Sequence, residues 1–299
     1  MLSWERLRVL AAVAEHGSIA AAAAALHVTG PAVTQQIRKL EREARVALIE
    51  PDGRGVRLTA AGHIAAQAAR GAARLVGQAE RSLATMDGQV VGPLRIGALN
   101  SSFGPLLGPA LRALTDEHPE VVPTARSGEA VDMVPLLFTR DLDLVIVESW
   151  SSLPVRVPPR IRLEPLTVHE IALAVSARHP LARHDTMTLA EVRDEVWTAC
   201  RPGTDHHDAQ LQAMRRHGIE PDIRYVVDDF LTQMTLVAEG LAVTLVPRPA
   251  VADSPGVRLL PVTPGLTRTI AMATREGPAT PVVEALTARL REVAGLASP

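Results

Sequence analysis

The stretch that decides the fold is residues 18–62, SIAAAAAALHVTGPAVTQQIRKLEREARVALIEPDGRGVRLTAAG. It predicts two short helices joined by a tight turn and followed by a glycine-broken hairpin. Ser18 is a favourable N-cap for the first helix, and Thr29 is one for the second. Pro31 suits the first turn of the second helix because its missing N–H would be unpaired there. The first helix carries apolar residues at the spacing of a buried stripe, namely Ile19, Ala22, Ala23 and Leu26.

The second helix has an apolar face and a polar face. Its apolar positions recur at helical spacing and predict a buried stripe of Val33, Ile37, Leu40 and Ala44. The opposite face carries Thr34, Gln35, Arg38, Lys39 and Arg42. Hydroxyl and amide side chains can read base edges in the major groove, whereas Arg and Lys neutralise phosphates. The pattern therefore predicts a helix-turn-helix that reads DNA.

Residues 48–58 predict a hairpin whose tip is Asp52-Gly53-Arg54-Gly55. A glycine-rich tip that holds arginine suits close approach to a phosphate backbone. The same pattern also fits an ordinary solvated hairpin tip. Beside a helix-turn-helix it favours a DNA-contacting wing, with Arg54 and Arg57 as its phosphate contacts.

This part of the chain resembles the N-terminal domain of the LysR-type transcriptional regulators. The matching positions, in order, are Gly17-Ser18, Ala22-Ala23, Leu26, Thr29, Pro31-Ala32-Val33-Thr34, Gln36-Ile37, Leu40-Glu41 and Leu58-Thr59-Ala60-Ala61-Gly62. Two positions depart from the family's pattern. Many members carry Gln where this chain has Gly30, and Phe-x-Arg where it has Ile49-Glu50-Pro51. Arg54 and Arg57 can replace the second of these contacts.

The resemblance implies a sequence-specific transcriptional regulator that binds double-stranded DNA at an imperfect inverted repeat in a promoter and is not an enzyme. RNA polymerase is a further candidate partner. The residues expected to contact DNA are Ser18, Thr29, Gly30, Pro31, Thr34, Gln35, Arg38, Lys39, Arg54 and Arg57.

The composition is that of a globular chain without an overall nucleic-acid signal. The 299 residues suit one to three domains, with 47% hydrophobic and 21% charged residues and a formal net charge of −2. A small reading head can still be basic on one face. The chain has neither a secretory start nor a long apolar segment, and its single cysteine, Cys200, excludes an internal disulfide framework. A cytoplasmic protein without membrane contact is expected.

A helix without proline is predicted over residues 60–88. Small and apolar residues recur along it at steps of mostly three and four: Ala61, Ala65, Ala68, Ala72, Leu75, Ala79, Leu83 and Met86. Such a seam lets two helices approach closely, although a helix packed on its own domain shows the same pattern. Regulators of inverted half-sites need two-fold symmetry, and the family resemblance implies a homodimer through this helix and a homotetramer.

The remainder alternates strands and helices. Strands are predicted over residues 94–99, 121–125, 142–147, 171–175, 196–199, 223–227, 242–246 and 266–274. Helices are predicted over residues 106–114, 131–138, 209–217, 230–239 and 282–293. This alternation indicates an α/β fold with parallel sheets. The expected organisation is a winged helix-turn-helix over residues 1–59, the linking helix, and an effector-binding domain over residues 93–299.

The family resemblance implies that this third domain is bilobed, like the type 2 periplasmic solute-binding proteins. Lobe one would hold about residues 93–165 and 267–299, and lobe two about residues 166–266. The chain would then cross between the lobes near Leu166 and return near Leu266.

A small-molecule effector is expected between the lobes, beyond the carboxyl ends of the strands. The candidate residues are Asn100, Ser101, Ser102, Phe103, Cys200, Arg201, Gly203, Thr204, Asp229, Phe230 and Thr232. Their hydroxyls and backbone amides suit a small anion, with Arg201 as a counter-charge. Ser102, Thr204 and Asp229 could instead simply cap helices.

Other functions have weaker sequence support. Asp205-His206-His207-Asp208 resembles a metal cluster, but adjacent helical histidines point in different directions, so no metal site and no cofactor is predicted. Cys200 has no second cysteine to resolve a sulfenic acid. No catalytic motif was found. The competing class is a stand-alone small-molecule binding protein or enzyme with an N-terminal interaction domain.

Overall fold

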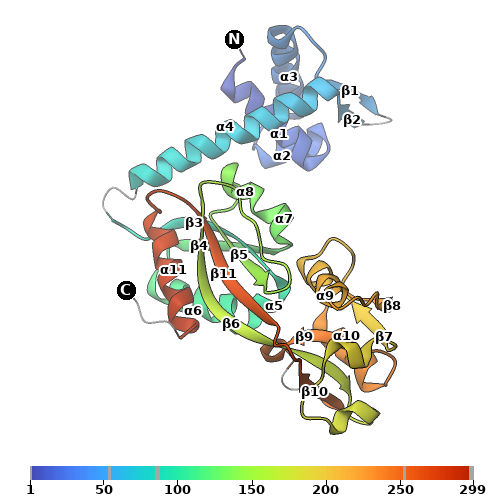
Figure 1. Ribbon diagram of the computed structural model, residues 1–299. Coiled ribbons are helices and arrows are strands. Elements are labelled where there is room, and N and C mark those ends of the chain that lie inside the picture. Colours follow the sequence, from blue (N-terminus) through green and yellow to red (C-terminus); the bar gives the residue numbers. More distant parts are fainter. Residues whose placement is uncertain (1, 53–54, 85–87, 252–253, 296–299) are drawn as a thin grey trace. The chain divides into compact units, whose positions relative to one another are not determined.

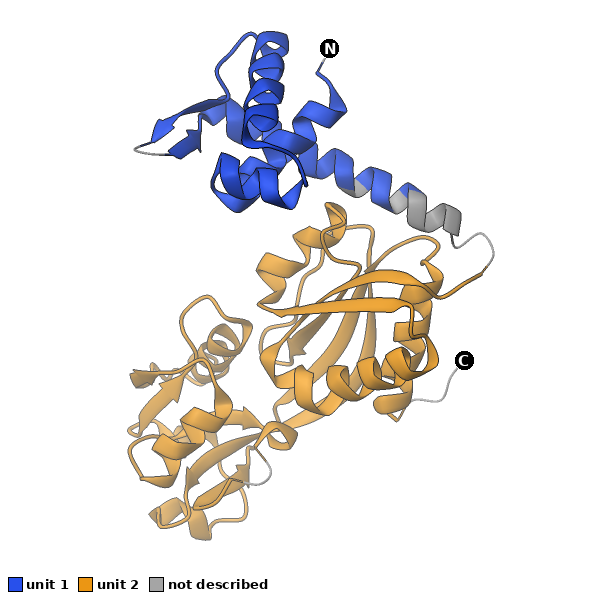
Figure 2. Cartoon of the chain, turned by 180° about the vertical axis from the view of Figure 1, so that it is seen from behind, with its two compact units in different colours: residues 1–86 blue, residues 87–299 orange. Residues whose placement is uncertain are grey.

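The computed structural model describes residues 2–52, 55–84, 88–251 and 254–295. The chain forms two compact units, residues 1–86 and residues 87–299, which are coloured separately in Figure 2. Each unit is described by itself.

The first unit contains the predicted helix-turn-helix and hairpin (Figure 1). Its elements are α1 (Trp4–His16), α2 (Ile19–Ala25), α3 (Gly30–Ala44), β1 (Ile49–Asp52), β2 (Gly55–Leu58) and α4 (Ala60–Ala84). The two predicted N-caps are observed, since Ser18 Oγ accepts from Ala21 N and Thr29 Oγ1 accepts from Ala32 N. Buried residues from α1, α2 and α3 form the core, among them Leu10, Val13, Ala22, Ala23, Val33, Ile37 and Leu40.

The hairpin and α4 are held against α3 by two local devices. The Glu41 carboxylate of α3 accepts the backbone N–H groups of Leu48 and Ile49 at 2.9 and 3.3 Å. Gly62, in the first turn of α4, lies so close to Leu48 that a Cβ atom there would overlap the Leu48 carbonyl oxygen. The close approach of helix and hairpin therefore requires glycine at this position.

The second unit is built on a seven-stranded sheet with the order β10-β6-β11-β5-β3-β4, in which β9 also pairs with β6. The strands are β3 (Gly92–Ala98), β4 (Val121–Ser127), β5 (Leu144–Trp150), β6 (Ile161–Ser176), β9 (Thr244–Pro247), β10 (Val257–Pro261) and β11 (Thr267–Arg275). A separate parallel pair consists of β7 (Val196–Ala199) and β8 (Asp222–Val226).

Helices flank both ends of this sheet. Around β3, β4 and β5 lie α5 (Asn100–Ser102), the π-helix Phe103–Leu107, α6 (Gly108–Glu117), α7 (Ala130–Met133), α8 (Pro135–Phe138) and α11 (Pro281–Val293). Around β7, β8 and β9 lie α9 (Asp205–Arg215) and α10 (Phe230–Ala238), with short 3-10 turns at Pro180–Arg183, Leu189–Val192 and Arg248–Ala250. We call the first group lobe one and the second group lobe two. Each lobe has its own buried core.

The prediction of purely parallel sheets is wrong, because the sheet is mixed. Strands β3, β4 and β5 are parallel, but β11 runs antiparallel to both β5 and β6. Strand β6 is likewise antiparallel to β9 and β10. The cause is the two-way crossing between the lobes, since β6 carries the chain into lobe two and β11 brings it back (Figure 1).

Two strand predictions also fell short. Residues 171–175 are only the second half of the 16-residue strand β6, and β10 was not predicted. The half of β6 before Ile171 alternates buried and exposed positions and carries Arg162, Glu164 and His169. The apolar run in the sequence therefore predicted only the second half of β6, which is buried on both faces.

Among the described residues, no single helix is long and apolar enough to cross a membrane. The one pair of helices that meets the length and composition test together, α1 and α2, is bent by 116°.

Candidate DNA-reading surface and inter-lobe cleft

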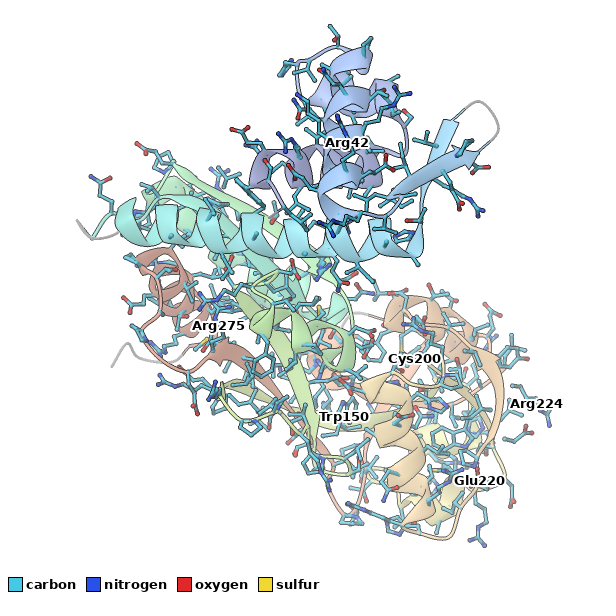
Figure 3. All side chains as sticks on the ribbon, turned by 90° about the horizontal axis from the view of Figure 1, so that it is seen from above. Arg42, Trp150, Cys200, Glu220, Arg224 and Arg275 are labelled. Carbon is cyan, nitrogen blue, oxygen red and sulfur yellow. The ribbon has the colours of Figure 1, made fainter. Side chains whose placement is uncertain are left out.

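The polar face of α3 remains open in the first unit. Gln35 and Arg38 are exposed, whereas Thr34 and Lys39 are half-buried. Thr34 Oγ1 donates to the Gly30 carbonyl at 3.1 Å, so part of its hydrogen-bonding capacity is used within the helix. Ser18, Thr29 and Pro31 lie at the starts of α2 and α3, where the first two act as caps. Arg42, on the same helix, is labelled in Figure 3.

Of the two arginines predicted in the wing, Arg57 lies in the described part of the chain. Arg57 is exposed on β2 and pairs with Glu50, its cross-strand neighbour, with Nε and Oε1 2.9 Å apart. An exposed pair of this kind is weak, so phosphate can compete for the guanidinium. Arg54 lies outside the described residues.

The predicted seam on α4 divides into two parts. Ala61 and Ala65 pack against the buried residues Leu10, Leu40 and Leu48 of their own unit. Further along, Ala68, Leu75, Val76 and Ala79 are exposed, and Ile64 in the first half of the helix is also exposed. One face near the start of the helix therefore stabilises its own unit, and exposed apolar residues lie in both halves. The predicted Leu83 side chain and Met86 lie outside the described part.

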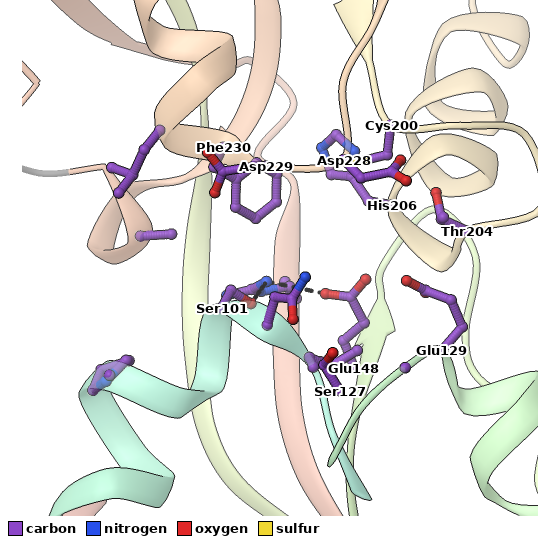
Figure 4. A pocket seen from close by; sticks show the side chains of 18 of the residues that line it. Ser101, Ser127, Glu129, Glu148, Cys200, Thr204, His206, Asp228, Asp229 and Phe230 are labelled. Atoms are coloured by element: carbon purple, nitrogen blue, oxygen red, sulfur yellow. Dashed lines mark hydrogen bonds and ion pairs between the residues drawn. The ribbon is translucent and has the colours of Figure 1, made fainter. Parts of the chain in front are cut away.

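The second unit has a cavity of about 420 Å³ between its lobes (Figure 4). Its wall on lobe one comes from the carboxyl ends of β3, β4 and β5, and its wall on lobe two from the segments after β7 and β8. This is where ligands bind in open α/β sheets. Seven predicted residues line it: Asn100, Ser101, Cys200, Arg201, Thr204, Asp229 and Phe230.

Four predicted residues do not line the cavity. Ser102 is buried, and its hydroxyl donates to the Leu99 carbonyl at 2.8 Å. The backbone N–H and the hydroxyl of Thr232 both donate to the Asp229 carboxylate, which caps α10. Phe103 and Gly203 are sequence neighbours of the lining residues Gly104 and Thr204, but they do not line the cavity themselves. The capping alternative also holds inside the cavity, because Thr204 Oγ1 caps α9 and the Asp229 carboxylate caps α10.

The charged core of the cavity was not predicted from the sequence. Arg268 of β11 pairs with Glu148 of β5 at 3.0 Å, and these side chains are only 2% and 5% exposed. Arg268 also donates to Ser101 Oγ and reaches His169 Nδ1, at 3.0 and 3.1 Å. Burial and the Arg268 charge lower the pKa of His169 to about 4, so this histidine is neutral and accepts the bond.

Asp228 and Leu231 also line the cavity and belong to the stretch 228–232 that sequence reasoning placed at a strand end. The remaining lining residues were missed from the sequence: Leu99, Gly104, Pro105, Ser127, Gly128, Glu129, His206, Pro249 and Ala250. One sequence feature could have identified Glu148 as a site residue. It is a charged residue within the apolar strand LVIVESW, and a buried charge needs a partner.

Cys200 is a buried thiol in this wall. Burial and the nearby carboxylates, Asp228 first among them, raise its pKa to about 12. Its sulfur accepts from Gln233 Nε2 at 3.5 Å. Oxidation requires thiolate character, so this environment makes Cys200 a poor redox sensor.

The histidines that follow serve structural contacts. His206 Nε2 lies 2.8 Å from the Leu245 carbonyl, and His207 Nδ1 lies 2.9 Å from Asp208. Among the described residues there is no group of three or more His, Cys, Asp or Glu side chains arranged to hold a metal ion.

Comparison with known proteins gives consistent matches over the whole chain. Residues 4–63 match the model of the bacterial regulatory helix-turn-helix protein of the lysR family, and residues 87–295 match the LysR substrate binding domain. The chain is 30% identical to the uncharacterized regulator YnfL of Escherichia coli, over 81% of this chain and 80% of that protein. It is also 30% identical to the dual regulator OxyR of Escherichia coli, over 91% of this chain and 88% of that protein.

Solved structures agree with these matches. The LysR family regulator CbnR in complex with its target DNA superposes with a TM-score of 0.71 at 26% identity, covering 98% of this chain and all of that one. Full-length OxyR from Pseudomonas aeruginosa shares the fold, with a TM-score of 0.68 over 100% of this chain and 99% of that one. The chain therefore belongs to the LysR family and is a DNA-binding transcriptional regulator with an effector-binding domain.

Proposed function

We propose that this regulator reads an inverted repeat through α3 and responds to a small molecule held between its two lobes. The observation that carries the proposal is the free polar face of α3, with Gln35 and Arg38 exposed beside a fully packed apolar face. Gln35 is positioned to read base edges, and Arg38 to neutralise phosphate. Thr34, Lys39 and Arg57 add contacts to the same surface.

Two copies would join through α4. The exposed apolar residues Ile64, Leu75 and Val76 are large side chains that a partner helix can cover. A two-fold dimer presents two α3 helices to two half-sites, and pairing of dimers gives a tetramer. RNA polymerase at the adjoining promoter is a further proposed partner.

The cleft between the lobes would couple ligand binding to DNA binding. A ligand that contacts both lobes stabilises one closure of the lobes over another and thereby changes how the dimer presents its reading heads. We also infer that the protein acts in the cytoplasm and is not an enzyme. Cys200, the one thiol in the cleft, is held protonated by burial, which supports the absence of nucleophilic catalysis.

Fluorescence anisotropy with the duplex upstream of the protein's own gene tests the proposal. Binding should be tighter than to an unrelated duplex and should fall steeply as salt rises, because counterions are released from phosphates. A folded protein that binds neither duplex would support the stand-alone binding protein or enzyme instead. Light scattering on the same sample measures the oligomer, and Leu75→Glu should shift it towards the monomer.

A further inference from the structure

The cavity between the lobes has an excess of acidic groups. The described residues that line it include four carboxylates, Glu129, Glu148, Asp228 and Asp229, and two guanidinium groups, Arg201 and Arg268. Each arginine is already paired, Arg268 with Glu148 at 3.0 Å and Arg201 with Asp228 at 2.5 Å. The Arg268 pair is buried, so this guanidinium is engaged within the protein, whereas the Arg201 pair is exposed at the rim and meets its charge only weakly.

The two helix N-termini on the lobe-two side of the cavity, those of α9 and α10, already hold protein carboxylates. The Asp205 N–H, in the first turn of α9, donates to Glu129 Oε2 at 3.1 Å, although Glu129 belongs to the opposite lobe. The Thr232 N–H of α10 donates to Asp229 at 2.7 Å. Carboxylates of the protein thus take the places that a ligand carboxylate or phosphate would seek.

Glu129 accepts the Asp205 N–H but has no arginine partner of the kind that Glu148 and Asp228 have. Within the described residues no cation lies within ion-pair distance of it, and the Asp229 charge is met by two hydrogen bonds from Thr232. Burial, together with the neighbouring charges of Asp205 and Glu148, raises the pKa of Glu129. Figure 4 shows the carboxylates of Glu129 and Glu148 turned towards the same space. A cation placed between them would relieve this repulsion.

A second acceptor in the cavity also has no partner. His206 is 4% exposed, and its Nε2 must donate because it lies 2.8 Å from the Leu245 carbonyl oxygen. Burial lowers the pKa of His206, so the ring is neutral and its Nδ1 is an acceptor. In the described part of the chain this buried atom has no hydrogen-bond partner. A ligand N–H or O–H group that reaches this atom would satisfy it.

We propose that the effector of this cleft carries a positively charged nitrogen, an ammonium or guanidinium group, bound between Glu129 and Glu148, with further N–H or O–H donors reaching His206. This rests on the proposed function, because it assigns the chemistry of the molecule that the cleft senses. Glu129 lies on lobe one, and His206 and Asp228 lie on lobe two. A ligand whose cation meets Glu129 and Glu148 on lobe one, and whose other donors reach His206 on lobe two, would draw the lobes together.

The test uses three probes with one five-carbon skeleton: 1,5-diaminopentane, 1,5-pentanediol and glutarate. Their binding to the full-length protein is measured by isothermal titration calorimetry at constant ionic strength. The diamine should bind roughly tenfold or more tightly than either of the others, because a charge-assisted hydrogen bond to a desolvated carboxylate is stronger than a neutral one. Glutarate binding as tightly as the diamine would overturn the proposal.

Two matched variants locate the charge. Glu129→Gln keeps an oxygen for the Asp205 N–H but removes the charge, and should weaken diamine binding roughly tenfold or more without weakening that of the diol. Glu220→Gln is the control, since Glu220 lies at the outer edge of lobe two, apart from Cys200 (Figure 3), and pairs with Arg215. It should leave diamine binding unchanged.

The outcomes separate this inference from the proposed function. If Glu129→Gln binds the diamine as the unaltered protein does, or if the unaltered protein shows no binding of the diamine while still binding operator DNA, the cation assignment is wrong and the regulator function stands. If the diamine binds with the expected charge preference but the protein ignores every duplex, the cation assignment stands and the proposed DNA function fails.

Discussion

The reading head and the inter-lobe cleft of this regulator are organised in opposite ways. The head is made from one continuous stretch, and the side chains that we propose as its DNA contacts, Gln35 and Arg38, are exposed. The cleft is assembled from segments as distant as Ser101 and Arg268, and its charged groups are bonded to one another. Surface charges in the head are therefore available to DNA, whereas most charged groups of the cleft already have partners within the protein.

The largest predicted effect follows from the buried pair in the cleft. Arg268→Met leaves Glu148 charged and unpaired, and should cost about 3–5 kcal/mol of unfolding free energy in the second unit. The double variant Glu148→Leu/Arg268→Met should recover most of this loss. Urea denaturation followed by the fluorescence of Trp150 and Trp197 measures both. A single variant as stable as the unaltered protein would contradict the described pairing.

The corresponding break in the head is Gly62→Ala. Its Cβ would overlap the Leu48 carbonyl, so α4 must move away from the hairpin at a cost of about 3 kcal/mol. DNA binding should be lost while the second unit keeps its unfolding midpoint. Gly104→Ala, where a Cβ meets nothing within 4 Å, is the control. Equal losses in both variants would show that the close approach at Gly62 is unimportant.

A pH effect is expected in the second unit, at Asp205 in the first turn of α9. Burial, aided by the Glu148 and Asp208 charges, raises the pKa of Asp205 to about 6 from an unfolded value of 3.8. An acid whose folded pKa is raised destabilises the fold when ionised, so this penalty is full above about pH 6 and disappears towards pH 3.8. Asp205→Asn should therefore raise the thermal midpoint at pH 7.5, with a difference that shrinks as the pH falls. A constant difference across this range would contradict the assignment.

The smallest effect is expected at Gly30, where many family members carry Gln. A Cβ at this position meets only Ile19 Cγ2, at 3.9 Å, which is ordinary contact. Gly30→Gln should change stability by less than about 0.5 kcal/mol and alter affinity for some operator sequences more than for others. Anisotropy with a set of single-base operator variants measures the change. A uniform loss on all of them would exclude a reading role for this position.

The same contrast explains how far the sequence could be interpreted. The helix-turn-helix follows from local signals, since the Ser18 and Thr29 caps and the apolar stripe of α3 all lie within thirty residues of one another. The pocket wall after β3 and β7 was predicted because strand ends are visible in the sequence. Glu129 and Arg268 were missed because their meeting depends on long-range pairing of strands.

The antiparallel direction of β11 also could not be predicted from the sequence. Strand β11 lies between β5 and β6 only because the chain crosses between the lobes twice, and alternation of strands and helices carries no information on such a return. The anionic effector was predicted from Arg201, whose partner Asp228 is 27 residues away. Sequence alone shows Arg201 as a lone charge, whereas the structure shows it paired with Asp228, and this pairing is one reason why we propose a cationic ligand instead.

We propose that α3 reads DNA, with Gln35 giving specificity and Arg38 giving affinity. The most direct test compares the ratio of affinities for the upstream duplex and an unrelated duplex in Gln35→Ala and Arg38→Gln. Arg38→Gln should weaken binding to both duplexes alike, with a shallower salt dependence, and leave the ratio unchanged. Gln35→Ala should lower the ratio. If Gln35→Ala instead weakens both duplexes equally, or neither variant changes binding, α3 is not the reading helix.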